Sequence, residues 1–319
     1  MTNSVMTHEA IQIRSNAIRQ KALELGFTAC GMAKAGPLHE YRSRMDSWLG
    51  QGHHATMGYM ERNQDKRLNP ALLVPGASTV IALAVNYFPG QGQHPDARYR
   101  ISKYAYGLDY HVVIKKKLFA LLDFIREQSE NPVQARVFTD SAPVLEKAWA
   151  QKAGIGATGK NSCLIIPGTG SYVFLAEIII NLELPVDTPF DKDLCGSCTR
   201  CMKACPTQAI TAPGVIDSSR CLSYLTIERK EEIPEAFAGK CQQWIFGCDI
   251  CQDVCPYNKV AQPHREPELQ PLPYVAWSHE QWENLTPEIY HKEIKKSGSP
   301  LSRVSFEKLT SNITLNQKG

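Results

Sequence analysis

The sequence predicts a mixed protein of the α+β or α/β class, in which a larger domain of helices and strands is followed by a smaller, cysteine-rich domain. Helix-type and strand-type patterns alternate through residues 1–184. Nine of the eleven cysteines then fall between residues 195 and 255. With 319 residues, the chain is long enough for about two domains, each with its own hydrophobic core.

The first domain begins with a helix, a strand and a second helix. Residues 10–27 place apolar side chains at helical spacing and end at Gly26, a helix-stop residue. Residues 78–88 are a short, β-branched apolar run of the kind that forms a buried strand. Residues 111–130 predict an amphipathic helix, because one stripe of its surface is apolar. That stripe consists of Ile114, Leu118, Leu121, Leu122 and Ile125.

The rest of this domain predicts a strand, a helix and a hairpin. Residues 135–140 form a short strand whose last residue is Asp140. The next helix is expected over 143–154, with a proline at its start and a glycine at its stop. Residues 162–181 then predict two strands joined by a Pro-Gly-Thr-Gly turn, which would make a β-hairpin.

A proline-punctuated stretch separates the first domain, residues 1–184, from the cysteine-rich domain at 185–262. The segment 263–319 is weakly patterned, so we expect it to be peripheral. No apolar run reaches the ~18 residues that a membrane span needs, and the N-terminus lacks an apolar signal core. We therefore expect a cytoplasmic protein without a membrane partner. The net charge of +3 neither demands nor excludes a nucleic-acid partner.

The cysteine-rich domain contains the four-cysteine run of bacterial ferredoxins. Residues 195–206 read Cys-x2-Cys-x2-Cys-x3-Cys-Pro, a spacing that is typical of [4Fe–4S] proteins. Zinc sites favour two separated Cys-x2-Cys pairs instead. In proteins with two clusters, the three closely spaced cysteines bind one cluster, and the cysteine before the proline binds the other. We therefore predict that one cluster is bound by Cys195, Cys198 and Cys201, and that Cys205 binds the other cluster.

A second, incomplete copy of the run follows. It supplies Cys248, Cys251 and Cys255, while an isoleucine occupies the position of the leading cysteine. One thiolate must then come from elsewhere, and the spacing leaves Cys221 and Cys241 as equal candidates. The first predicted cluster is bound by Cys195, Cys198, Cys201 and Cys255. The second is bound by Cys205, Cys248, Cys251 and either Cys221 or Cys241.

Some other motifs have simpler interpretations. Cys30 and Cys163 lie in apolar sequence and are expected to be buried structural thiols. Residues 154–160 lack the spacing of a phosphate-binding loop and read as a helix stop followed by a turn. Residues 109–114 begin like the Asp-x-His-x-x-Gly motif that ligates corrinoids, but Ile114 replaces its glycine. We therefore interpret His111 as a helix-start residue and not as a cobalt ligand.

Asp140 is open to two interpretations. A carboxylate at the C-terminal end of a strand lies where open α/β sheets place their chemistry. Partial burial there would raise its pKa and suit it to general-acid catalysis. Alternatively, an aspartate before Ser-Ala-Pro can cap the N-terminus of the helix expected at 143–153. The sequence by itself leaves both interpretations open.

Taken together, the segments resemble the epoxyqueuosine reductase family, a group of iron–sulfur and cobalamin enzymes that are distant relatives of reductive dehalogenases. The resemblance runs in order over about residues 10–260 and is far more specific than a ferredoxin motif. The segments that carry it include MGYMERN, SKYAYGLDYH, FTDSAPVLEKAWAQKAGIGATGKNS, GSYVFLAEI, CGSCTRCMKACPTQAI, RCLSYLTIE and GCDICQDVCPYNK.

The resemblance implies an oxidoreductase that reduces epoxyqueuosine to queuosine at the wobble position of tRNA. Two [4Fe–4S] clusters would pass electrons to a cobalamin whose cobalt has no protein ligand. The aspartate of the DSAP segment, Asp140, would be the proton donor. Cys221 would be the remote cluster ligand, which leaves Cys241 spare. The resemblance also implies that Arg62, Asp140, Lys160, Ser223 and Asp249 lie beside the corrin.

The implied partners are a tRNA with epoxyqueuosine in its anticodon loop and a low-potential electron donor, and we expect a monomer. The wobble base would be splayed from the loop into a pocket. Residues 98–104 and 115–117 are candidate phosphate contacts, although a solvated helix face is the simpler explanation of the lysine run. Many family members continue into helical repeats after a Gly-Ser-x-(Ile/Leu)-x-Arg stretch, found here at 298–303. If those repeats bind the anticodon arm, we expect this chain to bind tRNA with lower affinity or in a different way.

Two other classes of protein remain as alternatives. A reductive dehalogenase that acts on a small molecule would need a closed apolar pocket and usually carries an export signal. A simple electron carrier would need only the cysteine-rich domain, which would leave residues 1–184 without a role.

Overall fold

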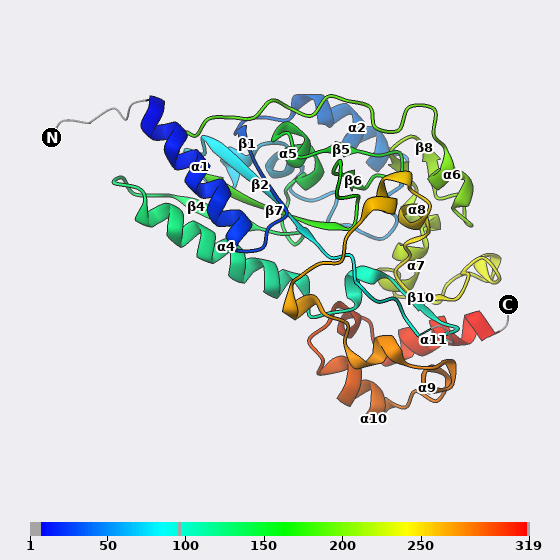
Figure 1. The fold of residues 1–319 in the computed structure, drawn as a ribbon. Helices are drawn as coiled ribbons and strands as arrows, with labels where there is room; N and C mark the ends of the chain where they lie inside the picture. The colour runs from blue at the N-terminus through cyan, green and yellow to red at the C-terminus, as the bar shows by residue number, and fades with distance from the viewer. Residues whose placement is uncertain (1–7, 95–96, 318–319) are drawn as a thin grey trace.

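The computed structural model describes residues 8–94 and 97–317, and its centre is a four-stranded sheet (Figure 1). Every neighbouring pair of strands is antiparallel. The mixed α/β class is therefore confirmed, in its α+β form. The strand order is β1 (Ala29–Lys34), β2 (Thr79–Asn86), β7 (Val173–Ile180) and β4 (Ala135–Phe138).

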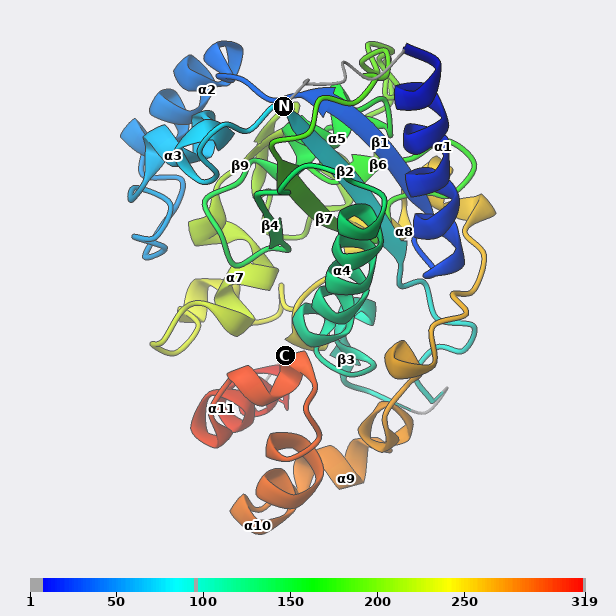
Figure 2. The ribbon, with the colours of Figure 1, turned by 90° about the vertical axis from the view of Figure 1, so that its left-hand side faces the viewer.

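Helices cover both faces of this sheet, which explains the unbroken apolar run of β2. On one face α1 and α4 lie side by side, and Ile81 and Leu83 of β2 pack against them (Figure 2). On the other face Val80 and Ala82 pack with Trp149 of α5. The helices of this part are α1 (His8–Glu24), α2 (His39–Gly50), α3 (Gln64–Leu68), α4 (Tyr110–Glu127) and α5 (Glu146–Lys152).

The predicted hairpin over 162–181 is wrong. A hairpin would require β6 (Leu164–Ile165) to pair with β7, but β2 and β4 already occupy both edges of β7. β6 pairs with β5 (Ala157–Thr158) instead. The turn between β6 and β7 is present, and a single bridge between Ile166 and Gly170 closes it. The turn residues were therefore informative about the bend but not about which strands pair.

The helix after β4 also differs from its prediction at one end. It begins at Glu146, three residues after the proline, and Leu145 occupies its N-cap position. Asp140 therefore does not cap it, and that interpretation is wrong. Asp140 lies two residues beyond β4 and has a left-handed backbone, with φ of 55°. The predicted stop is confirmed, since Gly154 follows the C-cap with φ of 73°.

The cysteine-rich part is built from short elements that dock on the sheet domain. One of them, β10, pairs in parallel with β3 of the first part. Backbone hydrogen bonds from Arg100 to Gln243 (2.7 Å) and from Ser102 to Phe246 (2.8 Å) reinforce this link. The elements are β3 (Arg100–Ile101), α6 (Arg200–Ala204), β8 (Ile210–Ala212), β9 (Val215–Ile216), α7 (Leu222–Ile227), β10 (Trp244–Phe246) and α8 (Ile250–Asp253).

The C-terminal elements share a buried core with both earlier parts. Tyr99 and Ile101 from the first part and Phe246 from β10 contribute to it, together with Trp282 and Ile313. The expected domain boundaries, after 184 and after 262, stay predictions. Within the described ranges, no helix has the length and apolar character of a membrane span. The last elements are α9 (His279–Glu283), α10 (Pro287–Ile289), a π-helical turn (Tyr290–Lys295) and α11 (Phe306–Gln317).

Candidate functional site

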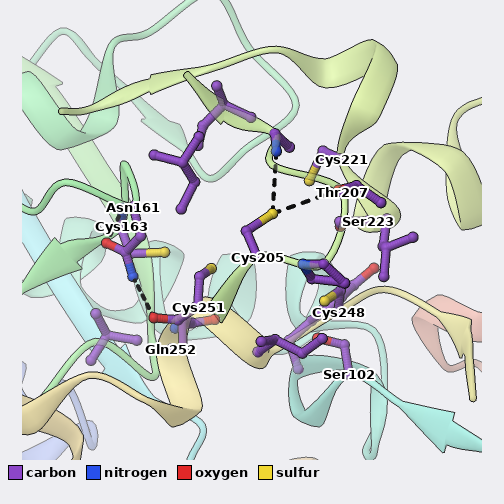
Figure 3. A pocket seen from close by; sticks show the side chains of 18 of the residues that line it. Ser102, Asn161, Cys163, Cys205, Thr207, Cys221, Ser223, Cys248, Cys251 and Gln252 are labelled. Atoms are coloured by element: carbon purple, nitrogen blue, oxygen red, sulfur yellow. Dashed lines mark hydrogen bonds between the residues drawn. The ribbon is translucent and has the colours of Figure 1, made fainter. Parts of the chain in front are cut away.

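A cavity of about 380 Å³ lies where the cysteine-rich part meets the sheet domain (Figure 3). One wall is aromatic and is formed by Tyr104, Tyr110 and Phe174. The rings of Tyr110 and Phe174 are stacked, with centroids 4.2 Å apart and planes inclined by 8°. The lining also includes cysteine side chains. The thiols that line the cavity belong to Cys163, Cys205, Cys221, Cys248 and Cys251.

Four of these thiols come from the cysteine-rich part, and the folding of that part brings them together. Cys205 follows α6, Cys221 immediately precedes α7, and Cys248 and Cys251 flank the start of α8. All four line the same cavity, where Figure 3 labels them. The predicted second ligand set therefore lines one cavity, if Cys221 rather than Cys241 is taken as its fourth ligand.

Short backbone contacts support these sulfurs. The N–H of Ala209 donates to the sulfur of Cys205 at 3.2 Å. Backbone N–H groups of Tyr224 and Ser223 donate to Cys221. Burial raises the pKa of Cys221 and of Cys248, so without a metal these thiols keep their protons. Hydrogen bonds of this kind stabilise the sulfur charge of a bound iron–sulfur cluster.

The predicted first ligand set forms a separate group nearer the surface. Cys201 interacts electrostatically with Cys195 and Cys255, and Cys255 interacts with Cys195 and Cys198. Cys255 of the second run therefore lies near cysteines of the first run, which is consistent with the predicted exchange of ligands between the two copies. The backbone N–H of Lys160 donates to the sulfur of Cys195 at 3.4 Å.

Cys241, the other candidate for the remote ligand, lies apart from both groups. It is 1% exposed, in an apolar cluster, and its thiol donates to the carbonyl of Phe237 at 3.4 Å. Among the residues that the structure describes, no three His, Cys, Asp or Glu side chains converge on a point that could hold one metal ion. The second thiol group surrounds a cavity instead, which suits a four-iron cube with its thiolate ligands.

Asp140 lies next to the aromatic wall of the cavity and is held by its neighbours. The hydroxyl of Tyr110 donates to its Oδ2 at 2.6 Å, and Nε2 of His111 lies 3.1 Å from the same oxygen. The backbone N–H of Asp140 donates to Oε1 of Glu146 at 2.5 Å. Tyr110 lines the cavity and is therefore the direct link between this carboxylate and the thiols.

A second carboxylate, that of Asp109, contacts the other ring nitrogen of His111. Oδ1 of Asp109 lies 2.8 Å from Nδ1 of His111. Arg303 reaches this pair from the C-terminal segment and donates to both oxygens of Asp109, at 2.9 and 2.7 Å. Asp109 is also the N-cap of α4, since it accepts from the backbone of His111 at 3.0 Å. His111 is thus a helix-start residue, as predicted.

The charges of this network differ from what the sequence suggested. Burial tends to raise the pKa of Asp140, but hydrogen bonds from His111 and Tyr110 outweigh it, so the net shift is downward. The expectation of a raised pKa is therefore wrong. Burial tends to lower the pKa of His111, but its bonds to Asp109 and Asp140 raise it. The Asp140 side chain is 56% exposed, so solvent moderates these effects.

The other predicted corrin neighbours occupy varied positions. Ser223 lines the cavity. Asp249 is 1% exposed, and its carboxylate accepts from the hydroxyl of Ser102 and the backbone of Lys103. The Lys160 ammonium donates to the carbonyls of two cysteine-loop residues, at 2.6 and 3.0 Å. Arg62 is exposed in the segment between α2 and α3.

Two lysines of the run at 115–117 are engaged in ion pairs. Lys116 pairs with Glu268 at 2.5 Å, and Lys117 pairs with Glu266 at 2.5 Å. The second pair is largely buried, so Lys117 supports the fold more than it presents a charge to solvent. The candidate phosphate contacts stay predictions.

Sequence reasoning missed Tyr110, Asp109, Arg303 and Cys163 as parts of the site. Tyr110 and Asp109 belong to the SKYAYGLDYH segment, which carries part of the family resemblance, so the sequence did contain a signal for them. Arg303 lies in the segment that was expected to be peripheral, and no local pattern distinguishes it from a surface arginine. Cys163 was expected to be a structural thiol, and its apolar neighbours in the sequence gave no sign of the cavity.

Comparison with known proteins now adds to this picture. Residues 194–258 match the family described as a 4Fe-4S double cluster binding domain, so fold and site define an iron–sulfur protein with two clusters. Residues 67–141 match the family described as Epoxyqueuosine reductase QueG, DUF1730. A protein named epoxyqueuosine reductase from Cellulophaga algicola is 48% identical over 300 residues, which cover 94% of this chain and 96% of the relative. The chain therefore belongs to the epoxyqueuosine reductase family.

More distant relatives agree. The epoxyqueuosine reductase of Pseudomonas aeruginosa is 38% identical and covers 94% of this chain and 84% of its own. A crystal structure of selenomethionine-labelled epoxyqueuosine reductase matches with a TM-score of 0.86 at 31% identity, over 95% of this chain and 80% of the other. The catabolic reductive dehalogenase NpRdhA matches at 14% identity and a TM-score of 0.54, over 99% of this chain and 38% of its own, which shows a shared fold.

Several predictions from the sequence are confirmed by these matches. The family resemblance, the double-cluster domain and the oxidoreductase class are all supported by close relatives. The electron-carrier alternative explained only the cysteine-rich part, whereas the family match extends over nearly the whole chain. The individual site residues, the cytoplasmic location and the monomeric state stay predictions.

Proposed function

We propose that the chain reduces epoxyqueuosine to queuosine in tRNA. Electrons would pass through two [4Fe–4S] clusters to cobalamin, and Asp140 would deliver a proton to the epoxide oxygen. The observation that carries this proposal is the position of Tyr110. Its ring lines the thiol-rich cavity, and its hydroxyl donates to Asp140 at 2.6 Å. An electron-carrying centre and a proton-carrying carboxylate would therefore meet at one place.

The substrate follows from the relatives and from the chemistry of the site. A solved epoxyqueuosine reductase, 31% identical with a TM-score of 0.83, is described in complex with an epoxyqueuosine-modified stem loop of tRNA-Tyr. A modified base in an anticodon loop can be splayed out of the single strand into a pocket, which duplex RNA does not allow. The same substrate class is proposed for this chain.

The cavity lining fits part of a large, mostly apolar cofactor. Tyr104, Tyr110 and Phe174 offer flat apolar surface, and Ser223 adds a hydroxyl. When bound, reduced cobalamin supplies a strong nucleophile or one-electron donor. We propose Ser223 as a corrin contact on this geometry, together with Asp140. Arg62, Lys160 and Asp249 are proposed as corrin neighbours on the family resemblance.

His111 is already occupied by other partners, which supports a cobalamin without a histidine ligand. Its Nδ1 pairs with Asp109 at 2.8 Å, and its Nε2 pairs with Asp140 at 3.1 Å. Ligation of a metal through either nitrogen would break one of these contacts. The sequence also argues against a histidine ligand, because Ile114 replaces the glycine of the corrinoid-ligating motif.

The network around Asp140 can hold and move one proton. Before substrate binds, the lowered pKa of Asp140 and the raised pKa of His111 favour a carboxylate beside an imidazolium. A bound substrate would exclude water and disfavour this pair of charges, so the proton would shift to Asp140. Loss of the epoxide oxygen as water takes two electrons and two protons, and Asp140 would deliver the first to the departing oxygen. His111 would then reload it.

We propose that the loop that carries Asp140 corresponds to a catalytic loop described in a relative. The epoxyqueuosine reductase of Bacillus subtilis, 30% identical with a TM-score of 0.84, is described with its catalytic aspartate loop swung out of the active site. In this chain, Asp140 is held inward by Tyr110 and His111 from α4. These two contacts are proposed to favour the inward position.

The proposal is tested by Asp140→Asn, which keeps the shape of the side chain and tolerates the left-handed backbone but has no acidic proton to donate. We expect reduction of epoxyqueuosine in tRNA to fall by ~10²–10⁴, the range for a well-placed general acid. Iron content, cobalamin binding and melting temperature should stay near wild type. The measurement is anaerobic turnover of epoxyqueuosine tRNA, followed by nucleoside analysis.

Asp123→Asn is the matched control, because Asp123 is an exposed carboxylate of α4 whose partner is Arg126. Its turnover should equal wild type. Full turnover in Asp140→Asn would remove Asp140 from the proton-donor role. Absence of turnover in the wild type, with both clusters and cobalamin bound, would refute the proposed function itself.

A further inference from the structure

The loop that carries Asp140 is held at its backbone by a residue to which the proposed mechanism gives no role. The backbone N–H of Asp140 donates to Oε1 of Glu146 at 2.5 Å. Glu146 is the first residue of α5, six positions further along the chain. Its side chain therefore reaches back across the loop that joins β4 to α5.

The backbone of Asp140 has an unfavourable conformation that needs support. Its φ of 55° is left-handed, and there the Cβ of an L-residue crowds the following carbonyl. The N–H of Ser141 donates to the carbonyl of Thr139 at 2.6 Å, so the three residues form a γ-turn centred on Asp140. A γ-turn with a positive φ at its centre is the rare and strained form. Without a contact from outside the loop, this turn would tend to relax, and the change in φ would re-aim the carboxylate.

Both ends of the loop are fixed to the sheet domain. Thr139 is 0% exposed, and its hydroxyl donates to the carbonyl of Leu175 in β7 at 2.9 Å. At the other end, Trp149 anchors α5 in the buried core on one face of the sheet. Glu146 therefore holds the middle of the loop from a helix that is firmly packed.

The contact with Glu146 differs from the other side-chain contacts of Asp140. Tyr110 and His111 both contact Oδ2, an oxygen of the carboxyl group that would donate the proton. Those contacts must change when the carboxyl group turns to the epoxide. The bond to Glu146 ends on the backbone instead, so it can persist during proton transfer. It requires an acceptor oxygen at position 146.

We propose that Glu146 is a positioning residue for the reduction, because its side-chain oxygen holds the backbone of Asp140 and keeps the carboxyl group beside Tyr110 at the cavity wall. This inference rests on the proposed role of Asp140 as proton donor. Glu146 does not touch the substrate or the reacting atoms. Loss of its oxygen lowers the fraction of molecules in which Asp140 is correctly placed. The chemical step is then slower, whereas binding of tRNA is unchanged.

The first test measures hydrogen exchange at the Asp140 amide in the full chain with both clusters, without cobalamin or tRNA. Glu146→Leu and Glu146→Ala have no acceptor oxygen, so the Asp140 amide should lose its protection in both. Glu146→Gln keeps an acceptor oxygen and should keep the protection. The amide of Ala153, which donates to the carbonyl of Trp149 within α5, should stay protected in all three variants.

The second test measures anaerobic turnover of tRNA that carries epoxyqueuosine. We expect kcat to fall by up to about 100-fold in Glu146→Leu and Glu146→Ala, the cost of a misplaced catalytic group. KM for the tRNA should equal wild type, and Glu146→Gln should be close to wild type in both constants. Glu40→Leu is the matched control, because Glu40 also contacts α5, through Lys152 at 2.8 Å. It should change neither the exchange nor kcat.

Equal protection of the Asp140 amide in wild type and in both Glu146→Leu and Glu146→Ala would overturn the inference. A rise in KM with kcat unchanged would do so too, since Glu146 would then act in tRNA binding. Turnover in Glu146→Gln as slow as in Glu146→Ala would show that a charge, and not the hydrogen bond, is required. Absence of turnover in the wild type would refute the proposed function instead. The two failures are distinguishable, because the exchange measurement needs no substrate.

Discussion

Cys221 and Cys241 have similar spacing from the ferredoxin runs but very different surroundings. Cys221 lies at the cavity, and backbone N–H groups at the start of α7 point to its sulfur. Cys241 is packed among apolar side chains, and burial raises its pKa to about 11. Cys221 lines the same cavity as Cys205 and Cys248, which supports its prediction as the remote cluster ligand.

Cys221→Ala should remove the second cluster. Iron and sulfide per chain should fall from about eight to about four each, because a cube with three thiolates and an open corner is labile during purification. Cys241→Ala, the matched control, should retain about eight of each. Anaerobic iron and sulfide analysis makes the measurement. A loss of iron in Cys241→Ala alone would reverse the assignment.

Sequence spacing predicts ligand residues where the ligands are close in the chain. The geometry of a [4Fe–4S] cluster fixes the spacing of Cys195, Cys198 and Cys201, so this motif can be recognised without a structure. The position of Cys163 at the cavity cannot be predicted in this way, because it depends on how two distant segments dock. Arg303 is hidden for the same reason, since it lies 194 positions from Asp109, to which it binds.

The central strand β7 contains a carboxyl group that has no partner. Glu177 is 0% exposed, and neither of its carboxyl oxygens has a hydrogen bond within the described structure. Burial raises its pKa well above the usual value, and the nearby charge of Glu146 raises it further. The folded protein therefore favours the protonated form of Glu177, and unfolding makes this carboxyl group easier to ionise.

Glu177→Gln should stabilise the protein at high pH and have little effect at low pH. The folded pKa of Glu177 lies above the unfolded value of about 4.5, so wild-type stability falls as pH rises from the unfolded pKa toward the folded one. The glutamine variant lacks this proton uptake, so the difference should grow with pH. Each pKa unit is worth ~1.4 kcal/mol.

Urea unfolding at pH 5, 6, 7 and 8 would measure the effect as a difference in midpoint. Glu183→Gln is the matched control, because Glu183 lies just beyond β7 and is exposed. Its difference from wild type should stay flat with pH. A difference for Glu177→Gln that is equally flat would show that Glu177 is ionised in the folded state.

Elements that are long and periodic were predicted best. The apolar stripe of α4 is buried residue for residue, because a helix with one apolar face has only one stable orientation on a sheet. The hairpin was wrong because strand pairing is decided by the whole sheet and not by the turn. The short elements of the cysteine-rich part have too few residues to carry a period, so only their cysteines were informative.

On the scale of the whole molecule, α11 joins the C-terminal segment to the cluster-binding part. Asn312 is 1% exposed, and its side-chain amide donates to the carbonyls of Thr226 at 3.0 Å and Ile245 at 2.9 Å. Thr226 belongs to α7, whose first turn presents Cys221 to the cavity. The last helix of the described chain therefore supports a predicted cluster ligand.

Asn312→Ala should destabilise the protein by ~1–3 kcal/mol, because two buried carbonyls lose their donor. It should also speed the loss of the second cluster in air, since α7 would be less firmly held. Thermal unfolding and the decay of cluster absorbance measure the two effects. Thr314→Ala, an exposed position of the same helix, should change neither. Stability equal to wild type would show that α11 does not support α7.

The pairing of β3 with β10 and of both with α11 sets the order in which the chain can fold. Residues near 100 leave the ribosome well before their partners at 244–246 and 309–316. Such non-local contacts form slowly, because a long loop must close first. The surface of the sheet domain around β3 can therefore be completed only after the cysteine-rich part and α11 have been synthesised.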